Sequence, residues 1–295
     1  MNKLTIKERS RILHLLCEGI SIRAITQLTG ASKNTVAKLL IDAGRICAAY
    51  HDTSVRNVKA ACVQVDEIWS FTYAKQKNVA VAKGTPEGAG DTWTWIAIDA
   101  DSKMILSYLV GGRDAEYAMW FMDDLAARVS NSIQLTINGQ SAYLEAAEDA
   151  FCADMDYVQL MKLYGSVDGN STDKCYSPPE CNGIRKRAIA GKSDAAYVSA
   201  SYVERQNLAM RMHMHQFTRL TNTFSKRVEN HAHAVALHMM YYNFVRIHKV
   251  SSITPAMAAG VADRLWEIED IAMLIEQAEA APRKHDPYKK REILN

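Results

Sequence analysis

The chain has 295 residues, 48% of them hydrophobic, which is enough for a full catalytic core and a smaller module, since domains usually run to about 100–200 residues. Its formal net charge is only +2, so a nucleic-acid partner would have to be bound by local patches of positive charge. The first residues lack the apolar segment of a signal peptide, and no apolar run approaches the roughly 18 residues of a membrane span. The six cysteines are scattered, which fits reduced thiols better than a disulfide framework. We therefore expect a cytoplasmic protein with no membrane partner.

The N-terminal part is predicted to be a helix-turn-helix domain spanning residues 1–45. Its three short helices are expected at residues 6–17, 21–29 and 33–42, with a tight turn before the third. Its small core is expected to consist of Ile12, Leu15, Leu16, Ile22, Ile25, Leu28, Val36 and Leu39. The third helix is predicted to enter the major groove of DNA, because it follows the turn and carries polar side chains on its outer face. These side chains are Lys33, Asn34, Thr35 and Lys38.

A polar stretch predicts a linker over residues 46–60, and a mixed α/β domain follows over residues 61–250. Strands are predicted at residues 62–73, 92–99, 104–110 and 133–136, and helices at residues 115–129 and 141–151. Three strands, a helix, a strand and a further helix is the order of an RNase H-like sheet, although other α/β folds share it. Helical patterns return at residues 195–217, 228–248 and 256–281, and residues 251–295 are assigned to a C-terminal helix and a charged tail.

Residues from about 160 to 195 are rich in glycine, proline and asparagine, which indicates an inserted loop. The loop carries a basic group that precedes the helix expected at residues 195–217. We expect this group to lie against DNA phosphates near the active site, the alternative being a merely solvated loop. Its members are Arg185, Lys186, Arg187 and Lys192.

Three polar residues stand out, although each also has an ordinary structural explanation. Asp66 interrupts a strand otherwise fit for a sheet interior, where a carboxylate must be hydrogen-bonded, exposed or bound to a cation. Its neighbour Glu67 is expected on the opposite face of the strand. Asn138 comes where the fourth strand ends, although Asn-Gly is also a common turn dipeptide. Glu204 shares a helical face with Asn207, Arg211 and His215, beside an apolar stripe of Val203, Met210, Met214 and Phe217, but a solvated surface helix would look similar.

Taken together, these segments resemble the DDE transposases of the insertion-sequence-one family, particularly the members with an N-terminal helix-turn-helix. The resemblance runs from about Val63 to Gly260. Asp66-Glu67-Ile68-Trp69-Ser70-Phe71 resembles the segment of the first catalytic aspartate, and Val203-Glu204-Arg205-Gln206-Asn207-Leu208 that of the catalytic glutamate. Further similar segments begin at Arg219, Tyr242 and Thr254.

The resemblance implies an RNase H-like catalytic core and a two-metal phosphoryl transfer. Two Mg²⁺ ions, with Mn²⁺ as a substitute, would activate a water or a DNA 3′-hydroxyl and stabilise the leaving oxygen. Asp66 would bridge both ions, Glu204 would hold one and residue 138 would help to hold the other. Arg211 would contact a backbone phosphate. His215, Arg219 and Lys226 are also expected to contact DNA.

In the family, an aspartate precedes the glycine at the position of Asn138. We therefore expect a bacterial, nucleoid-associated transposase that binds terminal inverted repeats and target DNA but is weakened or inactive in catalysis. Cutting and joining two ends implies a homodimer or a higher assembly on DNA. One alternative is a transposase descendant that persists as an inactive repressor or scaffold, and a more remote one is an RNase H-like nuclease acting on another nucleic acid.

Overall fold

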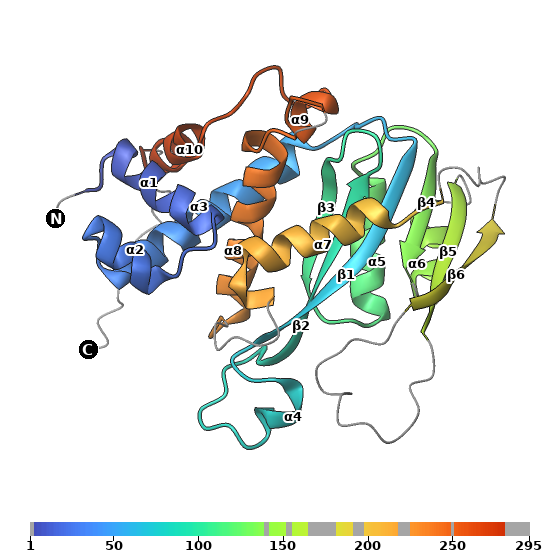
Figure 1. Ribbon diagram of the computed structural model, residues 1–295, viewed down its shortest axis with the longest axis horizontal. Helices are drawn as coiled ribbons and strands as arrows, with labels where there is room; N and C mark the ends of the chain where they lie inside the picture. The colour runs from blue at the N-terminus through green and yellow to red at the C-terminus, as the bar shows by residue number, and fades with distance from the viewer. Residues whose placement is uncertain are drawn as a thin grey trace, which may run out of the picture.

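The computed structural model describes residues 3–138, 142–151, 155–164, 181–190, 198–217, 225–248 and 251–280. The helices α1 and α2 and the C-terminal helix α10 gather at one end of the molecule, and the sheet fills the other end (Figure 1). Helix α3 runs from the first group toward the sheet (Figure 1). No helix in these ranges is long and apolar enough to cross a membrane.

The three N-terminal helices begin at capping side chains that the sequence supplies. The hydroxyl of Thr5 accepts a hydrogen bond from the amide of Glu8, and Ser21 and Ser32 cap the next two helices in the same way. Gly30 ends the second helix with φ 76°, a left-handed conformation that favours glycine. The helices are α1 (Ile6–Cys17), α2 (Ile22–Thr29) and α3 (Lys33–Ser54).

The described strands form one sheet in the order β3-β2-β1-β4-β5-β6. The central pairs β1·β4 and β4·β5 are parallel, whereas β1·β2, β2·β3 and β5·β6 are antiparallel. This order and these directions define an RNase H-like sheet with an additional strand, β6, at one edge. The strands are β1 (Cys62–Thr72), β2 (Gly90–Asp99), β3 (Ile105–Gly111), β4 (Ile133–Asn138), β5 (Met155–Tyr164) and β6 (Cys181–Ala190).

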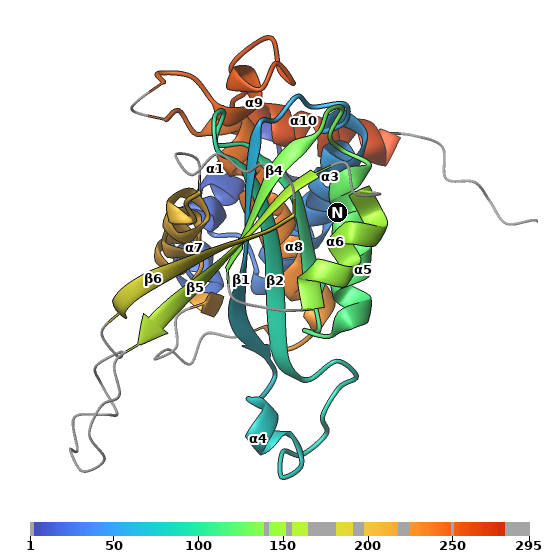
Figure 2. The same cartoon turned by 90° about the vertical axis from the view of Figure 1, so that its right-hand side faces the viewer.

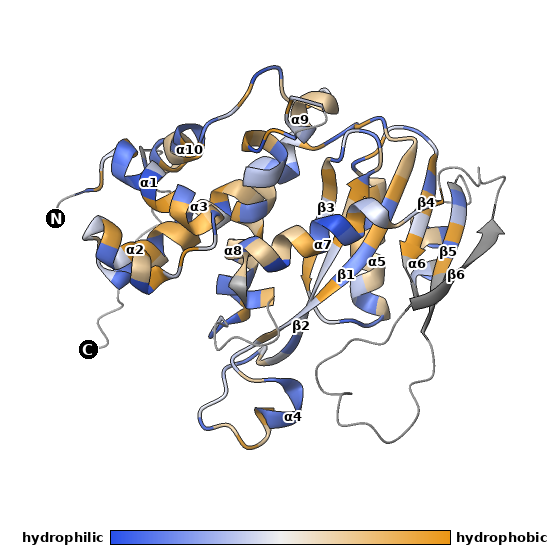
Figure 3. Cartoon of the chain, in the orientation of Figure 1, coloured by the Kyte–Doolittle hydropathy of each residue, from blue (hydrophilic) through white to orange (hydrophobic). Residues whose placement is uncertain are grey.

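Helices cover both faces of the sheet, as Figure 2 shows. Alternate residues of β1 point to the two faces, so Val63 and Val65 pack with α5 and α6, whereas Ile68 packs with α7 and α8. Hydrophobic stretches follow the central strands and α3 (Figure 3). The remaining helices are α4 (Gln76–Val79), α5 (Ala115–Ala126), α6 (Ala142–Phe151), α7 (Ser201–His213), α8 (Val228–Met240), α9 (Pro255–Ala258) and α10 (Ile268–Ala280). Short 3-10 and π-helical turns follow α7 and α8 at His215–Phe217 and Tyr241–Val245.

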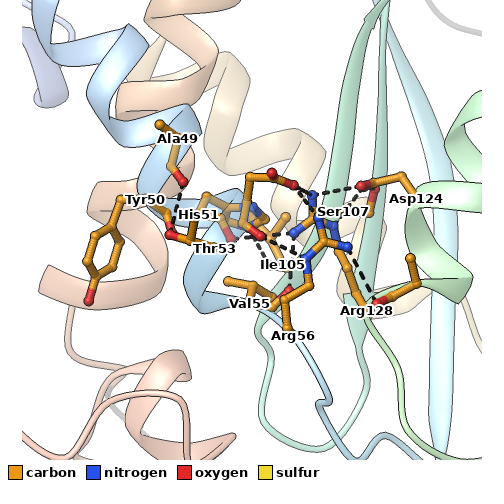
Figure 4. Close-up of polar contacts among 12 residues, drawn as sticks. Ala49, Tyr50, His51, Thr53, Val55, Arg56, Ile105, Ser107, Asp124 and Arg128 are labelled. Atoms are coloured by element: carbon orange, nitrogen blue, oxygen red, sulfur yellow. Dashed lines mark hydrogen bonds and ion pairs between the residues drawn. The ribbon is translucent and has the colours of Figure 1, made fainter.

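The expected end of the third helix at residue 42 was wrong, because α3 continues to Ser54 and takes up much of the expected linker at residues 46–60. One face of its second half is buried, since Cys47 and His51 pack against the rest of the chain. Arg128 holds the end of this helix by donating hydrogen bonds to the carbonyl oxygens of His51 and Val55, at 3.4 and 3.2 Å (Figure 4). Because these contacts join residues far apart in the sequence, no local sequence pattern predicts that the helix continues to Ser54.

Other expectations also needed correction. The stretch at 160–195 is not only a loop, because β5 extends to Tyr164 and β6 pairs with it. The helix expected at residues 256–281 is interrupted between α9 and α10. Leu28 does not belong to the small core, since 54% of its surface is exposed, whereas Ile12 and Ile25 are buried as expected.

A test of this arrangement is provided by Gly44, where α3 crosses α8. A Cβ atom at this position would lie 2.4 Å from both the Cβ and the carbonyl oxygen of His233. Helix propensity alone predicts that Gly44→Ala stabilises the protein by about 1 kcal/mol. We instead expect a loss of about 1–3 kcal/mol in the free energy of unfolding, because the backbones cannot move apart freely.

The matched control is Ala49→Gly, at an exposed position of the same helix. It should cost only the intrinsic difference of about 1 kcal/mol. Urea unfolding of both variants measures the two effects, and a stabilised Gly44→Ala protein would contradict the close crossing.

Candidate active site

The polar side chains of β1 on the α7 side of the sheet organise the candidate site. The side-chain oxygen Oε1 of Gln64 accepts hydrogen bonds from the backbone amides of Tyr202 and Val203, at 2.9 and 3.3 Å. These amides lie in the first turn of α7, whose N-cap residue is Ala200 and has no polar side chain to offer them. Gln64 therefore caps α7 from a strand distant in the sequence and fixes the start of this helix against β1.

Asp66 lies on the same face as Gln64, two residues further along β1. Its Oδ2 atom accepts a hydrogen bond of 2.8 Å from Nδ2 of Asn207, a residue of α7 that is only 6% exposed. Glu204 precedes Asn207 by one helical turn, so α7 carries Glu204 on the stretch of helix that is held against β1 beside Asp66. Asn207 and Gln64 were not among the expected site residues. The spacing of three residues, which places Asn207 on the same helical face as Glu204, could have identified Asn207.

The apolar stripe expected beside Glu204 is confirmed. Val203, Met210, Met214 and Phe217 are all buried in the core under α7. This stripe turns the polar side of α7 toward Asp66 and the surface, which is the arrangement that the helical spacing predicted.

The side chain of Glu67 lies on the opposite face of the sheet. Its Oε2 atom forms an ion pair of 2.6 Å with Nε of Arg113, whose guanidinium lies 4.1 Å from the ring centroid of Trp93. The Glu67 side chain is only 3% exposed, and Tyr143 of α6 lies close to it. Burial, together with the charge of Glu67, raises the pKa of Tyr143 well above its ordinary value. Of the two adjacent carboxylates, Asp66 alone faces α7.

Position 138 comes next to Asp66 by backbone register. The parallel pairing of β1 with β4 matches Val65 to Ile137, and Asn138 is the next and last residue of β4. The backbone at residue 138 is thus level with Asp66 on the neighbouring strand. The side chain of Asn138 lies outside the described residues.

A hard divalent cation prefers oxygen ligands. Asp66 and Glu204 supply carboxylates, and Oδ1 of the buried Asn207 has no hydrogen-bond partner among the described residues. No group of three or more histidine, cysteine, aspartate or glutamate side chains suited to a metal occurs in the part of the chain that the structure describes. An oxygen-rich site with two acidic residues fits magnesium or manganese better than zinc.

The residues expected to contact DNA are only partly covered by the structure. Lys33, Asn34 and Lys38 are exposed at the start of α3, and Thr35 is half-buried beside the capping Ser32. Arg211, near the end of α7, and Lys226, before α8, are also exposed. Lys192 and Arg219 lie outside the described residues, as do the side chains of Arg185, Lys186, Arg187 and His215.

Comparison with known proteins identifies the N-terminal part. A family model described as a helix-turn-helix domain matches residues 2–40. The whole chain is similar to a chain of the simian T-cell lymphotropic virus intasome in complex with PP2A regulatory subunit B56 gamma, with 14% identity, a TM-score of 0.40 and coverage of 88% of this chain and 77% of that chain. It is also similar to a chain of the piggyBac transposase synaptic complex with hairpin DNA, with 8% identity, a TM-score of 0.41 and coverage of 94% and 73%. No curated protein matches the chain.

The chain is a helix-turn-helix protein with an RNase H-like sheet.

Proposed function

We propose that the protein is a DDE-type DNA transposase of the insertion-sequence-one kind, which binds terminal inverted repeats through its helix-turn-helix and carries its catalytic residues on the RNase H-like sheet. The observation that supports this most is the hydrogen bond between Asp66 and Asn207, because it holds the helix of Glu204 against the strand of Asp66. A surface helix without a catalytic role would have no need of two polar attachments, at Gln64 and Asp66, to the centre of the sheet.

The chain's own residues have distinct tasks in this proposal. Asp66, Glu204 and residue 138 hold the divalent cations, and Asn207 orients the carboxylate of Asp66 by donating to its Oδ2 atom. Arg211, two turns beyond Glu204, binds a phosphate of the DNA backbone. When bound, the cations supply an activated oxygen nucleophile and stabilise charge on the leaving oxygen. The protein acts on DNA as a homodimer or a higher assembly, because two element ends must be cut together.

Asn138 sets the expected level of activity. Asparagine retains one side-chain oxygen of aspartate but lacks its charge, so cation binding is weaker while the fold and DNA binding persist. The alternative function is an inactive repressor or scaffold that binds the same repeats. Nicking of repeat DNA that depends on Mg²⁺ or Mn²⁺ supports the transposase, and sequence-specific binding without any nicking in either metal supports the repressor.

The DNA-binding half of the proposal is tested by the double variant Asn34→Ala, Thr35→Ala. The two side chains lie at the start of α3, where they can reach base edges in the major groove. We expect the preference for the terminal repeat over unrelated DNA to fall by roughly 10-fold or more, from about 1–3 kcal/mol for each base contact. Non-specific, salt-sensitive binding should remain, because Lys33 and Lys38 keep their charges.

A competition binding assay between repeat and unrelated DNA measures this preference. The matched control is Arg23→Ala, which removes an exposed charge from α2 instead of α3. The control should weaken binding to both DNAs similarly. An unchanged preference in the double variant would show that α3 does not read the repeat.

A further inference from the structure

Helix α3 belongs at once to the helix-turn-helix and to the core. Its first turns carry the exposed Lys33, Asn34 and Lys38, whereas its later turns bury Ala43, Cys47 and His51. A helix of 22 residues is about 33 Å long and has no flexible joint unless it is kinked. The proposed DNA-reading surface is therefore joined to the sheet by a continuous helix.

Both ends of the buried half of α3 are fixed to the core. Near its middle, Gly44 lies in backbone contact range of His233 on α8. Near its C-terminal end, Nε2 of His51 lies 3.2 Å from the carbonyl oxygen of Ile105 in β3, and Arg128 donates to two of the last carbonyl oxygens (Figure 4). Burial, with the charge of Arg128 in second place, lowers the pKa of His51 to about 4, so the ring remains neutral near pH 7. Because the His51 ring is buried and neutral, its contact with Ile105 does not change with pH near neutrality.

The helix-turn-helix is also held at sites other than α3. The turn after α1 rests on the end of α7, because a Cβ atom on Gly19 would lie 2.6 Å from the carbonyl oxygen of His213. The adjacent Glu18 accepts a hydrogen bond of 2.9 Å from the hydroxyl of Tyr241. On another side of α1, Arg9 forms a 3.0 Å ion pair with Glu279 of α10. The contacts with α7 and with the turn after α8 therefore attach the module to the core beside α3, and the ion pair joins α10 to the module.

We propose that the helix-turn-helix and the RNase H-like core move as one rigid body, so that each protomer measures a fixed spacing on DNA. This spacing separates the bases read by the start of α3 from the phosphodiester bond attacked at Asp66 and Glu204. The proposal rests on the proposed transposase function and adds a property of its DNA substrate. A helix-turn-helix on a flexible linker would instead tolerate repeats at several distances from the cleaved bond.

DNA substrates with inserted base pairs test the fixed spacing. Five extra base pairs between the repeat and the cleaved bond move the bond by about 17 Å and turn it to the other side of the duplex, whereas ten move it by about 34 Å and restore the side. With the cleavage-competent variant Asn138→Asp, we expect both insertions to reduce cleavage at the native bond by at least about 100-fold, since a displacement of 1 Å can already cost that much. Binding of the repeat should be unchanged. Retention of cleavage with ten base pairs, but not with five, would overturn the proposal in favour of a flexible connection.

A second measurement needs no catalysis. Backbone-amide NMR relaxation of the full-length protein reports how fast each part tumbles, and amides of α1 and α2 should share one rotational correlation time with those of β1 and β2. Faster tumbling of α1 and α2 would overturn the rigid body. If every DNA substrate remains uncut, the proposed function fails and the relaxation result alone decides whether the body is rigid. If cleavage occurs at all spacings, the function stands and the fixed spacing is wrong.

Discussion

Replacing Asn138 with aspartate is expected to create, or strongly raise, magnesium-dependent cleavage and joining of repeat DNA. The backbone of residue 138 is level with Asp66 on the adjacent parallel strand, and Asn207, one helical turn after Glu204 on α7, is hydrogen-bonded to Asp66. An added carboxylate there would supply the charge that a second hard cation needs. Removal of a group that acts only in the transition state often costs 10²-fold or more, so a gain of about 100-fold in cleavage rate is the expected scale.

Glu204→Gln in the same background is the control for this gain. It keeps the size and the helix propensity of residue 204 but removes its charge, so cleavage should return to the level of the unmodified chain. Repeat binding should be equal in all three proteins. An Asn138→Asp protein that binds repeat DNA normally, yet is inert with both magnesium and manganese, would contradict the proposed three-residue site.

The second large effect is expected at Arg128, which is 5% exposed. Besides the carbonyl oxygens of His51 and Val55, its guanidinium binds Asp124 at 2.7 Å (Figure 4). It also binds Asp52 at 3.0 Å. Arg128→Met keeps much of the apolar volume but removes the charged donor from all of these acceptors, although Ser107 still donates to Asp124 and Arg56 still pairs with Asp52. We expect a loss of about 3 kcal/mol in the free energy of unfolding, near the lower end of values for breaking a buried ion pair, because both carboxylates are partly exposed.

Arg56→Met is the matched control, because Arg56 also pairs with Asp52 but is more exposed. It should cost only about 0–1 kcal/mol. Denaturant unfolding measures both variants, and equal losses would show that the attachment of α3 does not depend on Arg128.

The effect of Arg128 should also depend on pH. Burial raises the pKa of Asp124, but hydrogen bonds from Arg128 and Ser107 outweigh it and leave this pKa below its ordinary value. The stability contributed by this depressed pKa is fully present above the unfolded-state value of about 3.9 and is lost as the pH falls through the lower folded-state value. The difference between wild type and Arg128→Met should therefore shrink below about pH 4. A difference that grows with acidification would contradict this assignment.

The helix-turn-helix could be predicted from the sequence because its signals are local. Capping residues such as Ser21 and a left-handed Gly30 mark helix ends within a few residues of the atoms they satisfy. The later course of α3 could not be predicted in this way. The polar residues from His51 onward look like a linker, and only distant partners, Ile105 and Arg128, make the burial of His51 possible.

The strand β6 was missed for a similar reason. Arg185, Lys186 and Arg187 give it a charge density typical of a solvated loop, but β6 is an edge strand and obtains its backbone hydrogen bonds from β5. At the site, the alternation of β1 correctly separated Asp66 from Glu67, since that rule needs no tertiary information. The cap that Gln64 provides for α7 was not predictable, because Gln64 and Tyr202 are far apart in the sequence.

We propose that Asp66, residue 138 and Glu204 form one cation site. Its most direct test is a crystal structure of the Asn138→Asp protein with repeat DNA and Mn²⁺, in which anomalous scattering locates the metal. We predict two manganese ions about 3.5–4 Å apart, with Asp66 bridging both and residues 138 and 204 each holding one. Manganese bound elsewhere, or residue 138 directed away from Asp66 and Glu204, would contradict the three-residue site.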